Sequence, residues 1–209
     1  IIAVHLYGNP SNMIKIRKII GNKKIKVIED CAQAHGAKLK KKHVGTFSDI
    51  STFSFYANKQ VTTGEGGMIT TNNLQLSEKC RSLRNLCFGK INRFNHDDIG
   101  WNYRMTNIQA SLGLSQMNNV NKIVKKKMEI GKRYYSNLVM NKHIKILPPN
   151  NSYSKNIYWV VGIVLKNKKI LAVDLAKKLL KFGIMTRPFF WPMHEQDVFK
   201  KMNLFKKTK

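Results

Sequence analysis

The sequence predicts an α/β fold, because segments that favour strands alternate with segments that have a helical pattern. Near the start of the chain, Ile1–Tyr7 is typical of a strand, Asn12–Ile20 of a helix that ends at Gly21, and Ile25–Ile28 of a second strand. A strand, a helix and a strand in this order form a parallel pair with a right-handed crossover. At 209 residues the chain is long enough to bury a substantial core.

The next part of the chain continues this alternation. Ile50–Tyr56 and Met68–Thr71 are typical of strands, and Leu74–Asn85 of a helix. Thr106 is a suitable N-cap for one long helix that runs to Leu138.

After Pro148 and Pro149 the pattern changes. It predicts a strand at Ile157–Leu165, a helix at Leu171–Phe182 and a strand at Ile184–Arg187. We therefore expect a large domain over residues 1–140 and a smaller, incomplete α/β domain over residues 141–209.

Composition excludes several classes of protein. The hydrophobic fraction is an ordinary 43%, and no apolar run is long enough to span a bilayer. The N-terminus has no basic region of the kind that precedes a secretory signal, so we expect a cytoplasmic protein without membrane attachment. Cys31, Cys80 and Cys87 have no CxxC spacing, which argues against a disulfide framework and against a zinc site. We expect no metal.

Lys59 is the strongest candidate for a chemical residue. It follows the strand-favouring run Ile50–Tyr56 and precedes a turn that contains Gly64, Gly66 and Gly67. A lysine held in a partly desolvated pocket has a lowered pKa and can form a Schiff base with a carbonyl, of which pyridoxal phosphate is the obvious example. The alternative is a solvated surface lysine.

Asp30 is the expected partner of Lys59. It ends the buried run that contains Ile25–Ile28, at the carboxyl end of a strand, where open α/β sheets bind their ligands. Pyridoxal phosphate needs a carboxylate against its pyridinium nitrogen. Strand alternation directs the neighbouring Glu29 to the opposite face. The alternative role for Asp30 is to cap the turn that follows.

Several motifs in order resemble the DegT/DnrJ/EryC1/StrS family. They include Val27-Ile-Glu-Asp-Cys-Ala-Gln-Ala-His-Gly36, Gly45-Thr-Phe-Ser-Asp49, the segment around Lys59, and Gly100-Trp-Asn-Tyr-Arg-Met-Thr-Asn-Ile-Gln-Ala110. Weaker similarity extends from Ile1 to about Phe199. The resemblance implies a sugar-nucleotide aminotransferase that depends on pyridoxal phosphate and has fold type I, with its large mixed-sheet domain only partly present.

The resemblance also implies a role for individual residues. Lys59 would carry the cofactor and move the proton, and Asp30 would pair with the pyridine nitrogen. Gln33 would lie near the ring and its phenolic oxygen, where an amide binds without adding charge. Ser54 would donate its hydroxyl to the cofactor phosphate. Asn102 would reach the phosphate of the neighbouring subunit, which implies a homodimer with shared active sites.

Three further residues are candidates for contacts with substrate. His35 follows the strand at Asp30, and its alternative role is that of a satisfied structural histidine. Arg187 and His194 lie in the expected small domain, where they would contact the sugar nucleotide or the carboxylate of the amino donor, Arg187 through its bidentate fork. The alternative for Arg187 is a surface residue beside an aromatic cluster.

The net charge of +27 is typical of a nucleic-acid binder. The 38 basic residues are, however, scattered over almost every segment, without an arginine-rich stripe. We therefore do not expect a nucleic-acid partner, although the positive field would attract an anionic nucleotide sugar.

The predicted reaction is transfer of an amino group from glutamate to a 4-keto-6-deoxy nucleotide sugar. In comparison with the family, the chain lacks the earlier loop that cradles the cofactor phosphate and the end of the small domain, so we expect it to be an internal fragment of a longer enzyme. Two alternatives remain open: an inactive fragment that acts as a binding or regulatory module, and an enzyme of the same family that aminates carbon 3 or another sugar.

Overall fold

The computed structural model describes residues 1–89 and 91–205, which form two compact units. The first unit contains Ile1–Met140 and Ile146–Val161, and the second contains Asn141–Lys145 and the described residues from Gly162 onward. The segment Ile146–Val161 therefore belongs to the first unit, whereas the sequence boundary at residue 141 would place it in the second. None of the helices in the described ranges is both long and apolar enough to cross a membrane.

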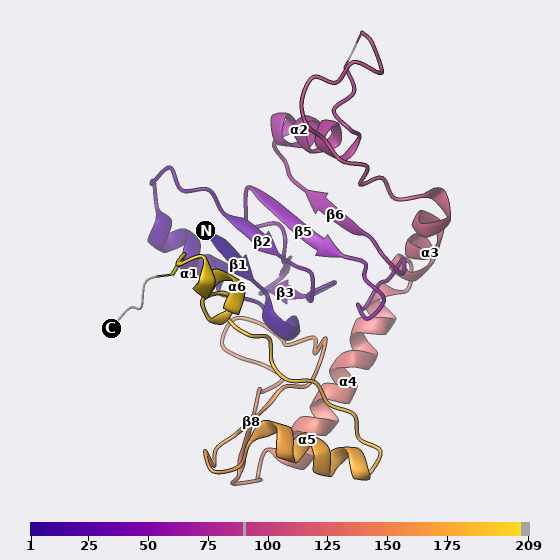
Figure 1. Cartoon of the computed structure of the whole chain (residues 1–209). Helices are drawn as coiled ribbons and strands as arrows, with labels where there is room; N and C mark the ends of the chain where they lie inside the picture. Colours follow the sequence, from indigo (N-terminus) through magenta and orange to yellow (C-terminus); the bar gives the residue numbers. More distant parts are fainter. Residues whose placement is uncertain (90, 206–209) are drawn as a thin grey trace. The chain divides into compact units, whose positions relative to one another are not determined.

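A four-stranded sheet with the order β1-β2-β5-β6 forms the centre of the first unit (Figure 1). Strands β1 (Ile2–Val4), β2 (Ile28–Asp30) and β5 (Ile50–Ser54) are parallel, and β6 (Gly67–Thr70) pairs antiparallel with β5. The parallel pairing of the first two strands confirms the prediction from the strand, helix and strand order.

Strands β1 and β2 differ from the predicted ranges. The chain leaves β1 after Val4 and enters a 3₁₀ turn, η1 (Leu6–Gly8), in which Tyr7 has a left-handed φ of 57°. Strand β2 begins only at Ile28, because the N–H of Val27 donates to the carboxylate of Asp49 (2.9 Å) and not to a neighbouring strand.

Helix α1 (Met13–Ile20) connects β1 to β2, as predicted. The side chain of Asn12 accepts a hydrogen bond from the N–H of Lys15 (3.0 Å), and Gly21 ends the helix. Helix α2 (Leu74–Arg84) also agrees with its prediction and has Asn73 as its N-cap. Both caps satisfy N–H groups that the first turn of a helix leaves unpaired.

The predicted long helix after Thr106 is two helices. Thr106 forms a capping box with Gln109 at the start of α3 (Asn107–Met117), which confirms Thr106 as an N-cap. Helix α4 (Val120–Leu138) follows after a break at Asn119, whose φ and ψ of −108° and 5° are not helical. The apolar periodicity is compatible with either arrangement, so it did not reveal the break.

Other elements differ from their predictions. The hairpin of β3 (Lys38–Leu39) and β4 (Lys42–His43) and strand β7 (Ile144–Ile146) were not predicted. The predicted strand at 157–165 is wrong over its first half, because only β8 (Ile163–Leu165) pairs, and it pairs with β7. Within the described residues, 184–187 form no strand. The second unit also contains the predicted helix and two shorter elements, α5 (Ala172–Lys181), η2 (Met193–Glu195) and α6 (Asp197–Lys201).

The two faces of the central sheet have different surroundings. The register aligns Ala3, Glu29 and Ser51 across three strands, and all three are buried. We call this the closed face. The opposite face, which we call the open face, carries Asp30 and Ser54 at the carboxyl ends of β2 and β5, and both are only partly buried. Alternation along a strand produces this division.

Candidate active site

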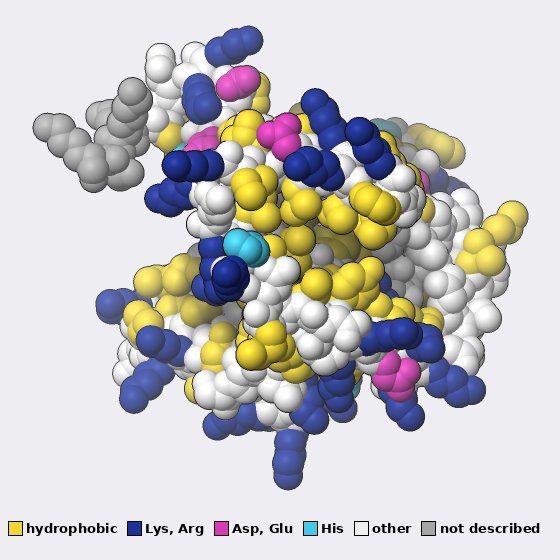
Figure 2. Space-filling model, turned by 90° about the horizontal axis from the view of Figure 1, so that it is seen from below, with side chains coloured by type: hydrophobic (Ala, Val, Ile, Leu, Met, Phe, Trp, Pro, Cys, Tyr) yellow, Lys and Arg dark blue, Asp and Glu magenta, His cyan; other side chains and the backbone are white. Residues whose placement is uncertain are grey.

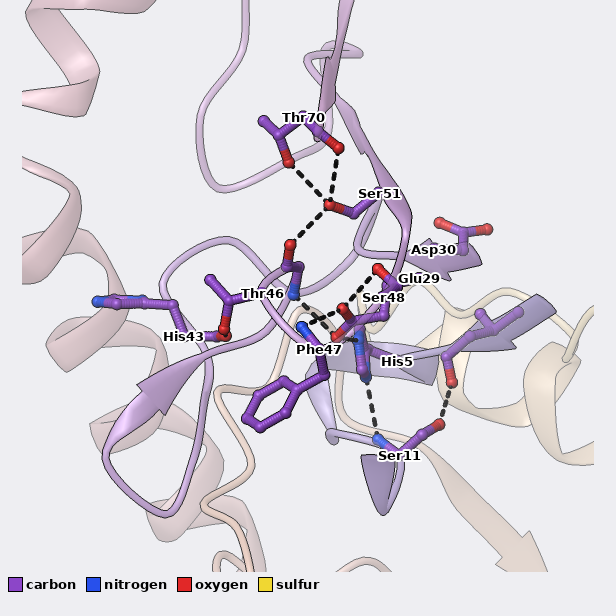
Figure 3. A network of polar contacts seen from close by, with 12 residues as sticks. His5, Ser11, Glu29, Asp30, His43, Thr46, Phe47, Ser48, Ser51 and Thr70 are labelled. Carbon is purple, nitrogen blue, oxygen red and sulfur yellow. Dashed lines mark hydrogen bonds and ion pairs between the residues drawn. The ribbon is translucent and has the colours of Figure 1, made fainter. Parts of the chain in front are cut away.

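Glu29 is the centre of a saturated hydrogen-bond network on the closed face (Figure 3). Its Oε1 accepts hydrogen bonds from His5 Nε2 (3.1 Å) and the N–H of Gly45 (2.9 Å). Its Oε2 accepts from the N–H of Phe47 (2.9 Å) and the hydroxyl of Ser48 (2.8 Å). Burial acts to raise the pKa of Glu29, but these hydrogen bonds outweigh it, and the pKa lies below its usual value.

This network could be mistaken for a metal site. His5, Glu29 and Cys31 are buried, and one ligand atom of each lies within 4.8 Å of the others. Both ring nitrogens of His5 are occupied, because Nδ1 accepts from the N–H of Ser11 (3.0 Å) and Nε2 faces Glu29. Burial raises the pKa of the Cys31 thiol, so it stays protonated. The hydrogen bonds of Glu29 instead link β2 to the segment after β1 and to the turn at 45–48.

Asp30 has a much more open environment than Glu29. Its Oδ1 accepts one hydrogen bond, from the N–H of Ala32 (2.9 Å), and its carboxylate points away from the Glu29 network (Figure 3). The contact with Ala32 is the capping role that the sequence left open. Capping uses only one of the two oxygens, so Asp30 retains the capacity to bind a further group.

Lys59 lies in the turn that follows β5 and is partly buried. Burial lowers the pKa of its amine, and the carboxylate of Asp30 acts in the opposite direction. These two influences show that the structure brings Lys59 and Asp30 within electrostatic reach of each other. The Lys59 Nζ also lies 4.0 Å from the centre of the Trp159 ring.

Gln33 and Ser54 lie on segments next to this pair. Gln33 Oε1 accepts a hydrogen bond from the N–H of Tyr7 (2.6 Å), which fixes the oxygen of the side chain and leaves its amide N–H₂ as the donor. Ser54 is the last residue of β5, and its Oγ accepts from the N–H of Tyr56 (3.3 Å). Among the hydrogen bonds of the described residues, the Ser54 hydroxyl proton has no acceptor.

His35 is buried among aromatic rings. Its ring centre lies 5.7 Å from those of both Phe53 and Phe55, and its Nδ1 lies 3.2 Å from Gln60 Oε1. Burial lowers the pKa of His35. The histidine borders a cavity of about 460 Å³ with Gly45 and the two phenylalanines. The Nδ1 contact fits the structural alternative for His35, but its Nε2 is buried and has no hydrogen-bond partner among the described residues, so the histidine is not fully satisfied. Its substrate role stays a prediction.

The other predicted residues take part in none of the contacts given above for this group. Asn102 is exposed, forms an isolated bridge with Asn85 and accepts a hydrogen bond from Arg104 Nε (3.1 Å). Arg187 and His194 belong to the second unit and are exposed; His194 Nε2 lies 3.8 Å from Glu195. Their roles, and that of Asn102 toward a second subunit, stay predictions.

Tyr7 and Trp159 were not predicted as site residues. Their rings stack with centres 6.2 Å apart, and the indole N–H of Trp159 donates to the carbonyl of Asn58 (2.8 Å). In the sequence, Trp159 lies within a run that has strand character. No spacing or motif connects it to Lys59, so only the fold could reveal the contact.

Basic side chains are distributed over the surface. On the face in Figure 2, Lys and Arg side chains are scattered around the outline among apolar and other polar groups, and they do not form one continuous stripe. A duplex or single strand of nucleic acid requires a patch that follows its backbone. The expectation that nucleic acid is not a partner stays a prediction.

Comparison with known proteins identifies the family. The family model described as "DegT/DnrJ/EryC1/StrS aminotransferase family" matches residues 1–209. The chain belongs to this family. Aminotransferases of the family depend on pyridoxal phosphate, and their structures confirm the predicted fold type I.

The relatives include enzymes that act on sugars. The chain is 40% identical over 205 residues to a GDP-perosamine synthase of Escherichia coli O157:H7, covering 95% of this chain and 54% of the relative. It is 37% identical over 204 residues to that of Vibrio cholerae, covering 96% and 54%. The chain thus spans about half the length of these relatives.

A solved structure with a similar fold is Helicobacter pylori PseC, an aminotransferase involved in the biosynthesis of pseudoaminic acid. Its TM-score is 0.90 at 26% sequence identity, and the match covers 100% of this chain and 57% of PseC. The similarity therefore includes both units of the chain.

Proposed function

We propose that the whole protein transfers an amino group from glutamate to carbon 4 of a 4-keto-6-deoxy nucleotide sugar. The product would be of the GDP-perosamine type and would serve the synthesis of a surface polysaccharide or other glycan. The observation that carries the proposal is the pair of Lys59 and Asp30, at the carboxyl ends of β5 and β2, in a chain that is 40% identical to a GDP-perosamine synthase.

The residues present fit pyridoxal phosphate. Lys59 offers an amine with a pKa lowered by burial, as covalent attachment to an aldehyde requires. Asp30 offers a carboxylate with free acceptor capacity on the open face of the sheet. Ser54 offers a hydroxyl proton for the phosphate, and Gln33 an amide donor for the phenolic oxygen. When bound, the cofactor supplies an electron sink for the carbon that loses its proton.

The side chains of this site would perform the remaining work. The Lys59 amine would take the proton from the carbon that carries the donated amino group and return it at the neighbouring position. The Asp30 carboxylate would keep the pyridine nitrogen protonated. Arg187 or His194 would bind the glutamate carboxylate or the sugar nucleotide, and His35 is retained as a second candidate for substrate contact.

A direct assay tests this proposal. The purified whole protein, supplied with pyridoxal phosphate and glutamate, would receive GDP-, dTDP- and UDP-linked 4-keto-6-deoxy sugars in separate reactions. We expect 2-oxoglutarate and one 4-amino sugar, detected by mass spectrometry, with the highest rate for the GDP-linked substrate. The Lys59→Ala variant is the matched control. Amination of none of these sugars by a folded, cofactor-loaded protein would contradict the proposal.

One observation favours a second substrate class. Over 111 residues the chain is 43% identical to a UDP-N-acetyl-3-dehydro-alpha-D-glucosamine 3-aminotransferase of Acidithiobacillus ferrooxidans, although this covers only 53% of the chain and 30% of the relative. A UDP-linked 3-keto sugar therefore belongs in the same assay. Preference for that substrate would move the site of amination to carbon 3.

The shared active site is a separate part of the proposal, because soluble homo-oligomers most often form C2 dimers. If Asn102 completes the phosphate site of the other subunit, a heterodimer of Asn102→Ala and Lys59→Ala protomers has one intact site. Mixed protomers should then recover up to about a quarter of wild-type activity, since about half of randomly assembled C2 dimers are heterodimers with one good site of two. A verified heterodimer without recovery would place Asn102 in its own subunit's site.

A further inference from the structure

Trp159 presents its indole ring to the amine of Lys59. The Lys59 Nζ lies 4.0 Å from the ring centre, and Trp159 is only 8% exposed. A cation within about 6 Å of an aromatic centre is attracted by the electron-rich face of the ring, and the attraction is larger when the site is shielded from water. Trp159 therefore favours one location for the ammonium group of the long, flexible Lys59 side chain.

The indole is anchored to the same loop that carries Lys59. Its Nε1–H donates to the carbonyl of Asn58 (2.8 Å), the residue just before Lys59. Its ring also stacks on Tyr7, with an angle of 16° between the two planes. Because the ring is fixed to the backbone next to Lys59, the distance between the indole and the amine is set locally.

The backbone around Trp159 is held in an unusual conformation. Tyr7 and Tyr158 have φ of 57° and 51°, in the left-handed region that side chains with a Cβ rarely adopt. The N–H of Trp159 donates to the carbonyl of Tyr7 (3.0 Å), and a Cβ on Gly8 would lie 2.8 Å from that same nitrogen. Strain of this kind persists only where the surroundings determine the conformation, and it is concentrated at functional sites.

We propose that Trp159 is a positioning residue that holds the free amine of Lys59 on its indole face whenever that amine is not attached to the cofactor. This inference rests on the proposed function, in which the amine of Lys59 must stay beside the reacting carbon to accept and return a proton. A lysine without such a contact would distribute its amine over many rotamers. The indole face limits that distribution and favours the protonated form.

The charge on Lys59 also depends on its other neighbours. The carboxylate of Asp30 stabilises the ammonium form of Lys59. Lys59 in turn is close enough to His35 for its charge to contribute to the lowered pKa of the histidine. A test must therefore change the ring without moving these groups. Replacement of tryptophan by tetrafluorotryptophan retains the indole N–H and closely retains its shape, but removes most of the negative charge on the ring face.

The test measures the reactivity of Lys59 in the whole protein without cofactor. Reductive methylation at neutral pH, quantified at Lys59 by mass spectrometry, reports the fraction of neutral amine. We expect fluorination to increase the rate about three- to ten-fold, because loss of the cation–π attraction leaves more of the amine unprotonated. The same fluorination in a Trp159→Phe background should leave the rate unchanged, which isolates Trp159 from Trp101 and Trp191.

A second comparison separates positioning from support of the loop. Trp159→Phe retains an aromatic face but loses the hydrogen bond to Asn58, whereas Trp159→Leu loses both. We expect Lys59 of the Phe variant to be methylated at close to the wild-type rate, because the aromatic face remains. Lys59 of the Leu variant should be methylated clearly faster, because the cation–π attraction is lost. Equal behaviour of the two variants, or a fluorinated protein that reacts at the wild-type rate, would overturn the inference.

These outcomes do not depend on the proposed function. The methylation rate reports the contact between Trp159 and Lys59 in the absence of cofactor. If Lys59 responds to fluorination but the cofactor attaches to another lysine, the contact exists and the proposed function fails. If the cofactor attaches to Lys59 but fluorination has no effect, the proposed function stands and the inference on Trp159 fails.

Discussion

Glu29 and Asp30 are adjacent carboxylates on one strand, yet the structure uses them in opposite ways. Glu29, on the closed face, is fully buried and accepts four hydrogen bonds, from His5 and from the turn at 45–48. Asp30, on the open face, is partly exposed and accepts one hydrogen bond, from Ala32. A carboxylate with every acceptor position occupied stabilises the fold, whereas a carboxylate with open positions can bind a ligand.

The same division applies to two serines of β5. Ser51 is buried on the closed face, where its hydroxyl lies 2.8 Å from the carbonyl of Gly45 and 2.7 Å from Thr70 Oγ1. Ser54 lies three residues further along, at the strand end on the open face, and accepts only from Tyr56 among the described residues. Substitutions in these matched pairs should therefore separate stability from cofactor chemistry.

The largest effect is expected for Lys59→Ala. Loss of the amine removes both the attachment point and the base that moves the proton, so transamination should fall by at least about 10³-fold in a single-turnover assay. The free energy of unfolding should change little, because Lys59 is not part of the closed-face network. Retention of more than a few per cent of the rate would show that another residue supplies the amine.

Asp30→Ala should reduce activity by about 10²- to 10³-fold, since an uncharged partner no longer keeps the pyridine nitrogen protonated. Its effect on stability should be only about 1 kcal/mol, the usual value for loss of a capping hydrogen bond. Steady-state kinetics and urea unfolding of the same preparation measure both quantities. Near-normal turnover would mean that Asp30 is only a cap.

Glu29→Ala should have the opposite profile. Removal of a buried, hydrogen-bonded charge leaves His5 and the donors at Gly45, Phe47 and Ser48 unpaired, which should cost about 3 to 5 kcal/mol in urea unfolding. In the molecules that fold, the sheet still positions Asp30. Activity should therefore fall only in proportion to the folded fraction. A Glu29→Ala protein that is stable but inactive would contradict the division between the faces.

The Glu29 network also predicts a dependence on pH. The folded-state pKa of Glu29 lies below its usual value of 4.5, so on acidification the unfolded chain binds the proton first. The stabilisation is therefore complete above the unfolded pKa and is lost as the pH falls through the folded pKa. Between neutral pH and about pH 3, wild type should lose more stability than Glu29→Gln, which has no carboxylate to titrate.

The smallest effects are expected for the two serines. Ser54→Ala should weaken binding of pyridoxal phosphate about ten-fold, as loss of one hydrogen bond to a charged group predicts, with little change in stability. Ser51→Ala should instead reduce stability by about 1 to 2 kcal/mol and leave cofactor affinity unchanged. Equal effects of both substitutions on cofactor binding, measured by absorbance titration, would contradict the division between the two faces of the sheet.

Much of this arrangement could be predicted from local sequence. The alternation of Glu29 and Asp30 follows from the period of two along a strand, and the caps at Asn12 and Thr106 follow from the preference of short polar side chains for helix starts. The order of strand, helix and strand also predicted the parallel pairing. These features depend on residues that are close together in the chain.

Features that depend on distant residues could not be predicted. The stack of Trp159 on Tyr7 joins residues about 150 apart in the chain, and its contact with Lys59 joins residues about 100 apart. No local pattern encodes such pairings. The run after Asn156 has strand character, but its first residues pair with the backbone of Tyr7 and Gly8 and not with a neighbouring strand. Tertiary contacts override the local preference there.

The most direct test of the central claim is to locate the cofactor on the chain. Borohydride reduction of the whole protein with pyridoxal phosphate, followed by trypsin digestion, should place the phosphopyridoxyl group on Lys59. Because trypsin does not cleave at the modified lysine, the labelled peptide should span residues 43–79. Attachment to any other lysine, or labelling that persists unchanged in Lys59→Ala, would contradict the assignment of Lys59.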